Sequence, residues 1–410
     1  MSEIPDFSLT RSEAVALLLE KWMFLHKTEY VPVAESFGRV TASAVYSQNT
    51  LPQSRVSAAD GIAVRSTDFE DGTPDTSTWI RNVNFAQADT GDDFPDEFDT
   101  VIPVEEIYFD ENGKLCFTEE FEYVKNSCVR PAGSMIQSGN RIAGANTYIT
   151  PVLMSALALG GAYQVEVLRR PKVVFIPTGD ELIPVGQMPV RGQHIETNSL
   201  MVSAYLKEWG ADAVCFPIVK DDVGLLKAAL ETAIAIADIV LINGGSSKGT
   251  EDFNAKLLKS CAEFFYHGMK CIPGRPVAVS LIGGTPVINL PGPPLATFLA
   301  LDWCVRAVVY HWYGIPLPKR QAIKARLEAP IRKPVDSEFV VRCAISRRSN
   351  GYTAAPVGHG VSQLDSMIVP NALFTAPIGT SEYAPGDEID VELLCGVENI
   401  RYVEVERRRA

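Results

Sequence analysis

Three stretches decide the fold of this chain: Pro171-Lys-Val-Val-Phe-Ile-Pro-Thr-Gly-Asp-Glu181, Asp238-Ile-Val-Leu-Ile-Asn-Gly-Gly-Ser-Ser-Lys-Gly-Thr-Glu-Asp252 and Thr285-Pro-Val-Ile-Asn-Leu-Pro-Gly292. Each stretch is a continuous apolar run that ends in a polar, glycine-bearing turn. Continuous rather than alternating apolar runs are typical of strands that are covered on both faces of a parallel sheet. Ligands of such sheets bind outside the carboxyl ends of the strands, where these turns would gather. The sequence therefore predicts an α/β domain with a mostly parallel sheet and a binding site at one edge.

Turn and linker signals divide the rest of the chain around this domain. Residues 66–130 are polar and strand-like, and Asn112-Gly113 between two short apolar runs is typical of a β-hairpin. A linker, Ile315-Pro-Leu-Pro318, separates the α/β stretch from residues 319–410, whose alternating pattern is again β-like. We therefore expect β-rich parts on both sides of the α/β domain.

Helix signals accompany the strands. Thr10-Arg-Ser-Glu13 is a capping box, which predicts an amphipathic helix to about residue 26. Pro294 suits a first helical position and predicts a long apolar helix to Trp312. Further helices are expected at residues 147–159, 199–209 and 223–237 and from 253 to about 263.

Composition limits the function classes. The 410 residues, 46% hydrophobic and 21% charged, are typical of a soluble protein of several domains. A net charge of -13 argues against nucleic-acid binding, which needs a basic face, but is compatible with a local basic pocket for a small anion. Eight scattered cysteines without a CxxC pair, and a start without a signal peptide, predict a cytoplasmic protein. The two long uncharged runs contain glycine and proline, so we expect no membrane span.

The glycine turn Asn243-Gly-Gly-Ser-Ser-Lys-Gly249 is a candidate phosphate site. It can present backbone N–H groups and two hydroxyls to a phosphate, with the following helix adding its dipole and Lys248 a point charge. It is not a P-loop, because the Gly-Lys-Ser/Thr order is absent. The alternative is a glycine turn that only joins a strand to a helix.

Charged residues in the neighbouring turns are the other candidates. The pair in Thr178-Gly-Asp-Glu181 suits either a cation or a pterin-like ring, or merely caps a helix. Asp252 lies just beyond the glycine turn, where a carboxylate beside a phosphate commonly holds Mg²⁺. Arg275, between Pro273-Gly274 and Pro276, suits an oxyanion such as molybdate or phosphate, although a loop arginine is more often a surface residue. For Asp60-Gly61 the ordinary interpretation is a tight turn.

Together and in this order, the motifs resemble the successive signatures of the MoeA/gephyrin E-domain family. The similarity also includes residues 94–105 and 385–394, and it covers nearly the whole chain. The motifs that carry it are Ser57-Ala-Ala-Asp-Gly-Ile-Ala-Val64, Thr178-Gly-Asp-Glu-Leu182, Asn243-Gly-Gly-Ser-Ser-Lys-Gly249 with Asp252, Pro273-Gly-Arg-Pro276 and Leu290-Pro-Gly-Pro-Pro294.

The resemblance implies an elongated homodimer of four-domain subunits, with the active cleft between the molybdopterin-binding α/β domain and the partner subunit. Its domains would be a linking domain I (residues 1–50 and 141–170), a β-rich domain II (51–140), the α/β three-layer domain III (171–318) and a C-terminal β-barrel-like domain IV (319–410). Members are molybdopterin molybdenumtransferases, which hydrolyse adenylylated molybdopterin, release AMP and insert molybdate into the dithiolene with Mg²⁺. A MogA-like adenylylating protein and molybdoenzymes are the implied partners.

Site residues follow from the resemblance position by position. Catalytic roles fall on Asp60, Asp252 and Arg275, of which Arg275 would help to receive molybdate. Mg²⁺ would be bound by Asp252, Asp60 and Glu105. The substrate-binding residues would be Thr178, Gly179, Asp180, Glu181, Gly244, Gly245, Ser246, Ser247, Lys248, Gly249, Pro273, Gly274, Pro291 and Gly292.

The chain departs from the family pattern at positions that the resemblance assigns to the active site. Ile62 replaces a tyrosine, Ser134 and Met135 replace carboxylates, Ile272 replaces a lysine, and Pro293 replaces an asparagine. Losing a charge at Ile272 while gaining one at Lys248 would retune an anion pocket, whereas the lost carboxylates are harder to compensate. The alternative function is therefore a molybdopterin-binding paralogue with lost or altered insertase activity, acting as a carrier, a regulator or a scaffold.

Overall fold

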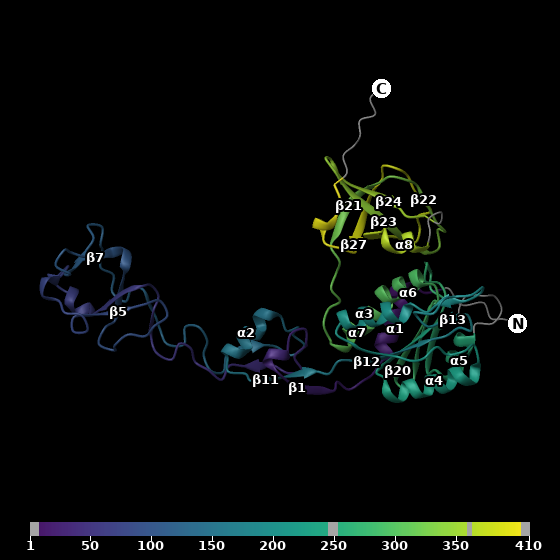
Figure 1. Cartoon of the computed structure of the whole chain (residues 1–410), viewed down its shortest axis with the longest axis horizontal. Helices are drawn as coiled ribbons and strands as arrows, with labels where there is room; N and C mark the ends of the chain where they lie inside the picture. The colour runs from purple at the N-terminus through teal and green to yellow at the C-terminus, as the bar shows by residue number, and fades with distance from the viewer. Residues whose placement is uncertain (1–7, 245–252, 359–362, 403–410) are drawn as a thin grey trace, which may run out of the picture. The chain divides into compact units, whose positions relative to one another are not determined.

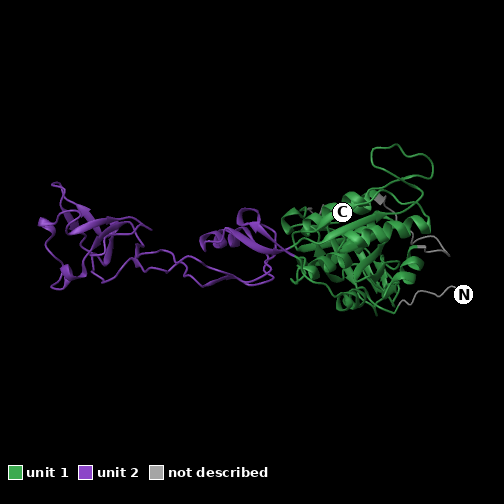
Figure 2. Cartoon of the chain, turned by 90° about the horizontal axis from the view of Figure 1, so that it is seen from below, with its two compact units in different colours: residues 1–27, 169–410 green, residues 28–168 purple. Residues whose placement is uncertain are grey.

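The computed structural model describes residues 8–244, 253–358 and 363–402 (Figure 1). The chain divides into two compact units, residues 1–27 with 169–410, which we call unit 1, and residues 28–168, which we call unit 2 (Figure 2). None of the described helices is long and apolar enough to cross a membrane.

The centre of unit 1 is a six-stranded sheet. Its strands, in sheet order, are β15 (Asp212–Cys215), β12 (Lys172–Pro177), β16 (Ile239–Asn243), β20 (Thr285–Leu290), β19 (Ala278–Ile282) and β17 (Phe264–His267). The first four are mutually parallel, and β19 and β17 add an antiparallel edge. All five residues of β16 are buried, which confirms the prediction of strands covered on both faces.

Helices cover both faces of this sheet, so the α/β part has three layers. α4 (Val223–Ile236) and α5 (Phe253–Cys261) lie on one face and share a core with alternate residues of β12 and β16, such as Val174 and Ile242 (Figure 1). The other helical elements are α1 (Arg11–Lys21), α3 (Asn198–Glu208), α6 (Pro294–Ala300) and α7 (Arg306–Trp312), with a π-helical turn, Leu301–Val305, joining α6 to α7. The long helix predicted from Pro294 to Trp312 is thus confirmed as a helical run with one widened turn.

The capping box at the start of α1 is present. Thr10 Oγ1 accepts from the Glu13 N–H (3.3 Å) and Glu13 Oε2 accepts from the Thr10 N–H (2.8 Å). The helix ends at Lys21 instead of near residue 26, because Trp22 takes an extended conformation and its ring stacks with that of Trp312. The helix predicted at 147–159 begins four residues later, at Pro151, and α4 and α5 end one and two residues earlier than predicted, whereas α3 has the predicted length and begins one residue earlier.

We expect Thr10→Ala to lower the apparent free energy of unfolding of unit 1 by about 1 kcal/mol, because the hydroxyl that satisfies an otherwise open backbone N–H is removed. Urea denaturation followed by tryptophan fluorescence measures this change. Thr10→Ser keeps the hydroxyl and is the control; an equal loss in both variants would show that the cap is not the cause.

The C-terminal part of unit 1 is a second, mostly antiparallel sheet. Its strands run in the order β18 (Cys271–Ile272), β23 (Glu338–Arg348), β24 (Gly351–Pro356), β21 (Ala322–Leu327), β27 (Glu388–Leu393) and β25 (Ala372–Ala376). An additional pairing of β23 with β25 closes five of these strands into a ring around one apolar core. Smaller elements of unit 1 are β13 (Leu182–Ile183), β14 (His194–Ile195), β22 (Ile331–Arg332), β26 (Glu382–Tyr383) and α8 (Gln363–Ile368).

Unit 2 contains several small sheets around separate cores. Its elements are β1 (Thr28–Pro32), β2 (Val45–Tyr46), β3 (Val56–Ser57), β4 (Gly61–Val64), β5 (Phe85–Ala88), β6 (Thr100–Pro103), β7 (Ile107–Phe109), β8 (Leu115–Phe117), β9 (Val129–Arg130), β10 (Arg141–Ala143), α2 (Pro151–Leu159) and β11 (Gln164–Leu168). β1 pairs with β11, β2 with β10, β3 with β9, and β4 lies between β5 and β6. β7 and β8 form the hairpin predicted around Asn112-Gly113. The division into four domains stays a prediction.

Candidate functional site at the ends of the central strands

The carboxyl ends of β12, β16 and β20 lie next to one another in the sheet. Thr178, directly after β12, donates to the Asn243 carbonyl from its backbone N–H (2.8 Å) and from its hydroxyl (3.2 Å). The turns that follow the apolar runs therefore begin next to one another, at the edge of the sheet where the parallel strands end.

The buried side chain of Asn243 fixes these strand ends relative to one another. Its Nδ2 donates to the Pro291 carbonyl (2.6 Å) and lies 3.2 Å from Thr297 Oγ1. Its Oδ1 accepts from Asn198 Nδ2 (2.7 Å), which also donates to the Gly292 carbonyl (2.8 Å). A side chain with partners directly after β20 and on α3 and α6 makes the arrangement rigid, because breaking these bonds would leave buried polar atoms unsatisfied.

Gly244 is required by the close approach of the neighbouring turn. Its φ is +120°, and a Cβ there would lie 2.4 Å from the Thr178 carbonyl oxygen and 2.7 Å from the Thr178 hydroxyl. Its own carbonyl accepts from Asn254 Nδ2 (2.9 Å), and that amide also lies 3.2 Å from Asn289 Oδ1. Glycine lets the backbone of one strand end lie against the other, so the turns after β12 and β16 begin side by side.

We call this cluster the strand-end cradle: Thr178, Asn198, Asn243, Gly244, Asn254, Asn289, Pro291, Gly292 and Thr297. Within the described residues, Asn198 Oδ1 and Asn289 Nδ2 are buried and have no hydrogen-bond partner. The cradle thus unites the predicted Thr178, Gly244, Pro291 and Gly292 and retains unused polar atoms. The predicted Gly245, Ser246, Ser247, Lys248, Gly249 and Asp252 lie outside the described residues.

Sequence reasoning did not assign the asparagines of the cradle or Thr297. A signal was available, because Asn243 and Asn289 are polar residues within strands whose other buried residues are apolar. A buried polar side chain in such a strand needs partners, so it marks a place where other polar groups converge.

The turn after β12 carries the predicted Gly179, Asp180 and Glu181. Gly179 has a φ of +153°, and a Cβ there would lie 2.8 Å from a Glu181 carboxylate oxygen. Asp180 and Glu181 are exposed, and the Asp180 carboxylate lies 3.8 Å from Lys220 Nζ. Burial, with the charges of Glu181 and Asp180, raises the pKa of the neighbouring Asp221. This side of the cradle is therefore acidic.

The loop that bears Pro273, Gly274 and Arg275 leaves the sheet at the same edge. The antiparallel register pairs His267 with Ala278 and Ala278 with Asn289, so residues 268–277 extend from the edge at which β20 ends. β17 is four strand positions from β12, which corresponds to about 19 Å. The Arg275 guanidinium lies 3.4 Å from Ser337 Oγ at the start of the C-terminal sheet.

Asp60 and Glu105 lie close to each other in unit 2. Asp60 occupies the bend between β3 and β4, and its carbonyl accepts from the Val104 N–H (2.8 Å), one residue before Glu105. The Thr90 N–H donates to Asp60 Oδ1 (2.7 Å) and holds the pKa of that carboxyl below its usual range. Both carboxylates are exposed.

The described residues do not by themselves complete a metal site. Nowhere in residues 8–244, 253–358 and 363–402 do three or more His, Cys, Asp or Glu side chains cluster so as to hold a metal ion. Asp60 and Glu105 supply two carboxylates, and Asp252 falls in the part that the structure leaves undescribed. A Mg²⁺ ion therefore has no complete set of donors among these residues.

The replaced family positions have ordinary structural environments. Ile62 is buried in the core of unit 2 with Phe69 and Ile102, whereas Met135 is 62% exposed. Pro293 precedes α6 and makes no side-chain capping bond. Ile272 is half-buried in β18.

Two family models match this chain, one over its N-terminal part and one over the α/β part that bears the strand-end cradle. Residues 9–161 match the model of the MoeA N-terminal region (domain I and II), and residues 174–311 match that of a probable molybdopterin binding domain. The combination defines a molybdenum cofactor biosynthesis protein with a pterin-binding α/β domain.

The chain belongs to the MoeA family. It is 27% identical over 385 residues to a molybdopterin molybdenumtransferase of Nostoc, with 88% of each chain covered. It is also 27% identical over 318 residues to the enzyme of that name from Haemophilus influenzae, covering 75% of this chain and 78% of the relative. A solved molybdopterin biosynthesis MoeA protein from Pyrococcus horikoshii has the same fold, with a TM-score of 0.77 at 24% identity over 95% of this chain and 99% of that chain.

Proposed function

We propose that the chain is a molybdopterin molybdenumtransferase that inserts molybdate into adenylylated molybdopterin and releases AMP. The observation that supports this most is the strand-end cradle, in which Gly244 lets the ends of β12 and β16 lie against each other and the Asn243 side chain bonds to Pro291, directly after β20, so that the glycine turn begins where three strands end. A phosphate-bearing pterin is a ligand that such a glycine-lined edge suits, because N–H groups and small residues allow close approach.

In this proposal the turn from Gly244 to Gly249 binds the phosphates. Thr178, Gly179, Asp180 and Glu181 contact the pterin, and Arg275, with Pro273 and Gly274, receives molybdate as the second substrate. Arginine suits this task because its planar guanidinium stays charged and forms paired hydrogen bonds to oxyanions. Asp252 would bind Mg²⁺ with Asp60 and Glu105 of a second copy in a homodimer; because the described donors are incomplete, no step is assigned to the ion.

A second function is favoured by one observation. Met135, where the resemblance implies a carboxylate, is an exposed apolar side chain, and Ile62, where it implies a tyrosine, is buried in the core of unit 2. A molybdopterin-binding paralogue that carries or stores the pterin would need the cradle but not these groups. With either function, we expect the protein to act in the cytoplasm, with a MogA-like protein that supplies the pterin and molybdoenzymes that receive the cofactor.

Turnover of adenylylated molybdopterin separates the two functions. Purified protein is incubated with this compound, molybdate and Mg²⁺, and AMP and the metal content of the pterin are measured. AMP release with molybdenum incorporation supports the insertase, tight pterin binding without turnover supports the carrier, and absence of pterin binding contradicts both.

We expect Asp252→Asn to lower AMP release about a hundredfold, which corresponds to about 2.7 kcal/mol of lost transition-state stabilisation, with little change in melting temperature. The amide keeps the size of the side chain but removes the charge that a cation needs. Asp390→Asn, on an exposed position of β27, removes a carboxylate elsewhere in unit 1 and is the control. Equal rates in both variants would contradict the role of Asp252.

A further inference from the structure

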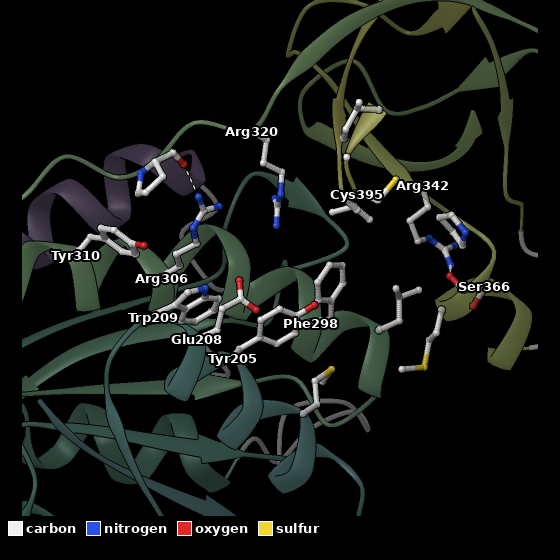
Figure 3. Close-up of a pocket in the computed structure, with 18 residues that line it drawn as sticks. Tyr205, Glu208, Trp209, Phe298, Arg306, Tyr310, Arg320, Arg342, Ser366 and Cys395 are labelled. Carbon is white, nitrogen blue, oxygen red and sulfur yellow. Dashed lines mark hydrogen bonds between the residues drawn. The ribbon is translucent and has the colours of Figure 1, made fainter. Parts of the chain in front are cut away.

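Unit 1 contains a cavity that does not involve the strand-end cradle. Its volume is about 720 Å³, and its walls come from α3, from the α6–α7 run and from the C-terminal sheet (Figure 3). α3 begins with the cradle residue Asn198, whereas the cavity is lined by Tyr205 and Trp209, which lie about 10 and 16 Å further along the helix. A cavity of this size suits a small organic ligand.

One wall of the cavity is aromatic. Tyr205 and Trp209, one helical turn apart on α3, stack with ring centroids 5.3 Å apart, and Phe298 of α6 lies 5.8 Å from Tyr205 (Figure 3). Burial raises the pKa of the Tyr205 hydroxyl, so the ring is neutral at physiological pH. Adjoining rings of this kind offer stacking and edge contacts to a flat ring.

The remaining lining of the cavity carries excess positive charge. Arg306 and Arg320 both pair with the one carboxylate of Asp302, at 3.3 and 2.6 Å, which leaves one charge of the three groups uncompensated. Arg320 extends into the cavity from the segment that leads to the C-terminal sheet (Figure 3). The only carboxylate that lines the cavity among the described residues is that of Glu208, which is exposed.

Arg342, on β23, adds a guanidinium that pairs with none of the described carboxylates. It is half-buried and donates to the Ser366 carbonyl (3.0 Å) and the Val357 carbonyl (3.4 Å), and no ion pair of Arg342 is present within the described residues. Burial alone lowers its pKa. A guanidinium has five N–H donors, so two bonds to neutral carbonyls leave donors available for an anion. In a chain with a net charge of -13, arginines that gather without an equal number of paired carboxylates indicate a site for an anion.

We propose that this cavity binds a small aromatic anion, that is, a flat aromatic or heteroaromatic ring that carries a carboxylate or phosphate. The ring lies against Tyr205 and Phe298, and the anionic group is bound by Arg342 and Arg320. Because these arginines belong to the C-terminal part and the rings to the α/β part, the ligand connects the two sheets of unit 1, which already meet where Leu299 packs against Val340 and Leu373.

The test uses 2-naphthoate as the probe and the full-length protein, with binding measured by isothermal titration calorimetry. 2-Naphthamide has the same ring without the charge, and acetate has the carboxylate without the ring. We expect 2-naphthoate to bind with one site per chain, and both 2-naphthamide and acetate to bind at least tenfold more weakly.

Substitutions then locate the site. Arg342→Gln is expected to weaken 2-naphthoate binding at least tenfold, and Tyr205→Leu to weaken 2-naphthoate and 2-naphthamide alike. Lys324→Gln removes a positive charge from an exposed position of β21, outside the cavity, and is expected to change binding less than twofold. If Arg342→Gln lowers the melting temperature, Arg320→Gln serves instead, because Arg306 still pairs with Asp302.

Three results would overturn the proposal. They are no binding of 2-naphthoate at millimolar concentration, equal affinity for 2-naphthoate and its amide, and unchanged affinity in both arginine variants. The calorimetry needs neither molybdate nor turnover, so its outcome is independent of the insertase assay.

Discussion

Gly244→Ala is expected to lower the apparent free energy of unfolding of unit 1 by about 4 kcal/mol and to abolish pterin binding. The alanine would hold a φ of +120° that side chains disfavour, and its Cβ would lie 2.4 Å from the Thr178 carbonyl oxygen. The nearest contacting atom is a backbone oxygen, so relief requires β12 and β16 to move apart at the strand-end cradle. Chemical denaturation and a pterin-binding assay measure the two effects.

Gly292→Ala is the matched control for stability. Its Cβ would lie 3.7 Å from the Gly244 Cα, an ordinary van der Waals distance, and its φ is not in the left-handed region. We expect its melting temperature to stay close to that of the original chain. If both glycine variants melt alike, the close approach at Gly244 is not what makes glycine necessary there.

Gly61→Ala is expected to disrupt the sheet of β4, β5 and β6 in unit 2. A Cβ on Gly61 would lie 2.0 Å from the Ile102 carbonyl oxygen on the paired strand, so the β4–β6 ladder cannot form around it. We expect a loss of more than about 4 kcal/mol, seen as rapid hydrogen exchange of the amides of β4 and β6.

Gly144→Ala provides the comparison within the same unit. Its nearest contact would be Thr147 Oγ1 at 3.6 Å, and its backbone suits any residue. Protection in β4 and β6 should be unchanged in this variant. Retained protection in Gly61→Ala as well would show that the unit tolerates a Cβ at the strand pairing, contrary to the distance.

The parallel part of the central sheet could be predicted from the sequence because its strands are covered on both faces. Runs such as residues 239–242 carry no polar side chain, and that continuity is readable without any partner. The antiparallel edge formed by β17 and β19 was not predicted. Its hairpin with β20 turns at Gly283-Gly284, both with positive φ, and this glycine pair is the sequence signal that indicates it.

The candidate site was predictable where a residue stands at a strand end. Thr178 and Gly244 follow apolar runs directly, so the sheet rule brings them together. Asn198 and Thr297 begin or lie within helices, and their roles depend on pairing with Asn243 across the fold. The cavity lay beyond sequence reasoning for the same reason, since Tyr205 and Arg342 are joined only by the packing of two sheets.

Unit 2 interrupts unit 1 between Lys27 and Arg169, and the two crossing points are joined by a hydrogen bond from the Arg169 N–H to the Lys27 carbonyl (2.8 Å). The first segment of unit 1 consequently finds its partners late in the chain: the Leu9 N–H donates to the hydroxyl of Tyr266, 257 residues onward. At about 5–20 residues per second, a ribosome needs on the order of ten seconds or more to supply that partner. During this interval the apolar face of α1, with Ala14 and Leu18, has left the ribosome without its cover, so nascent chains halted before residue 266 should bind chaperones.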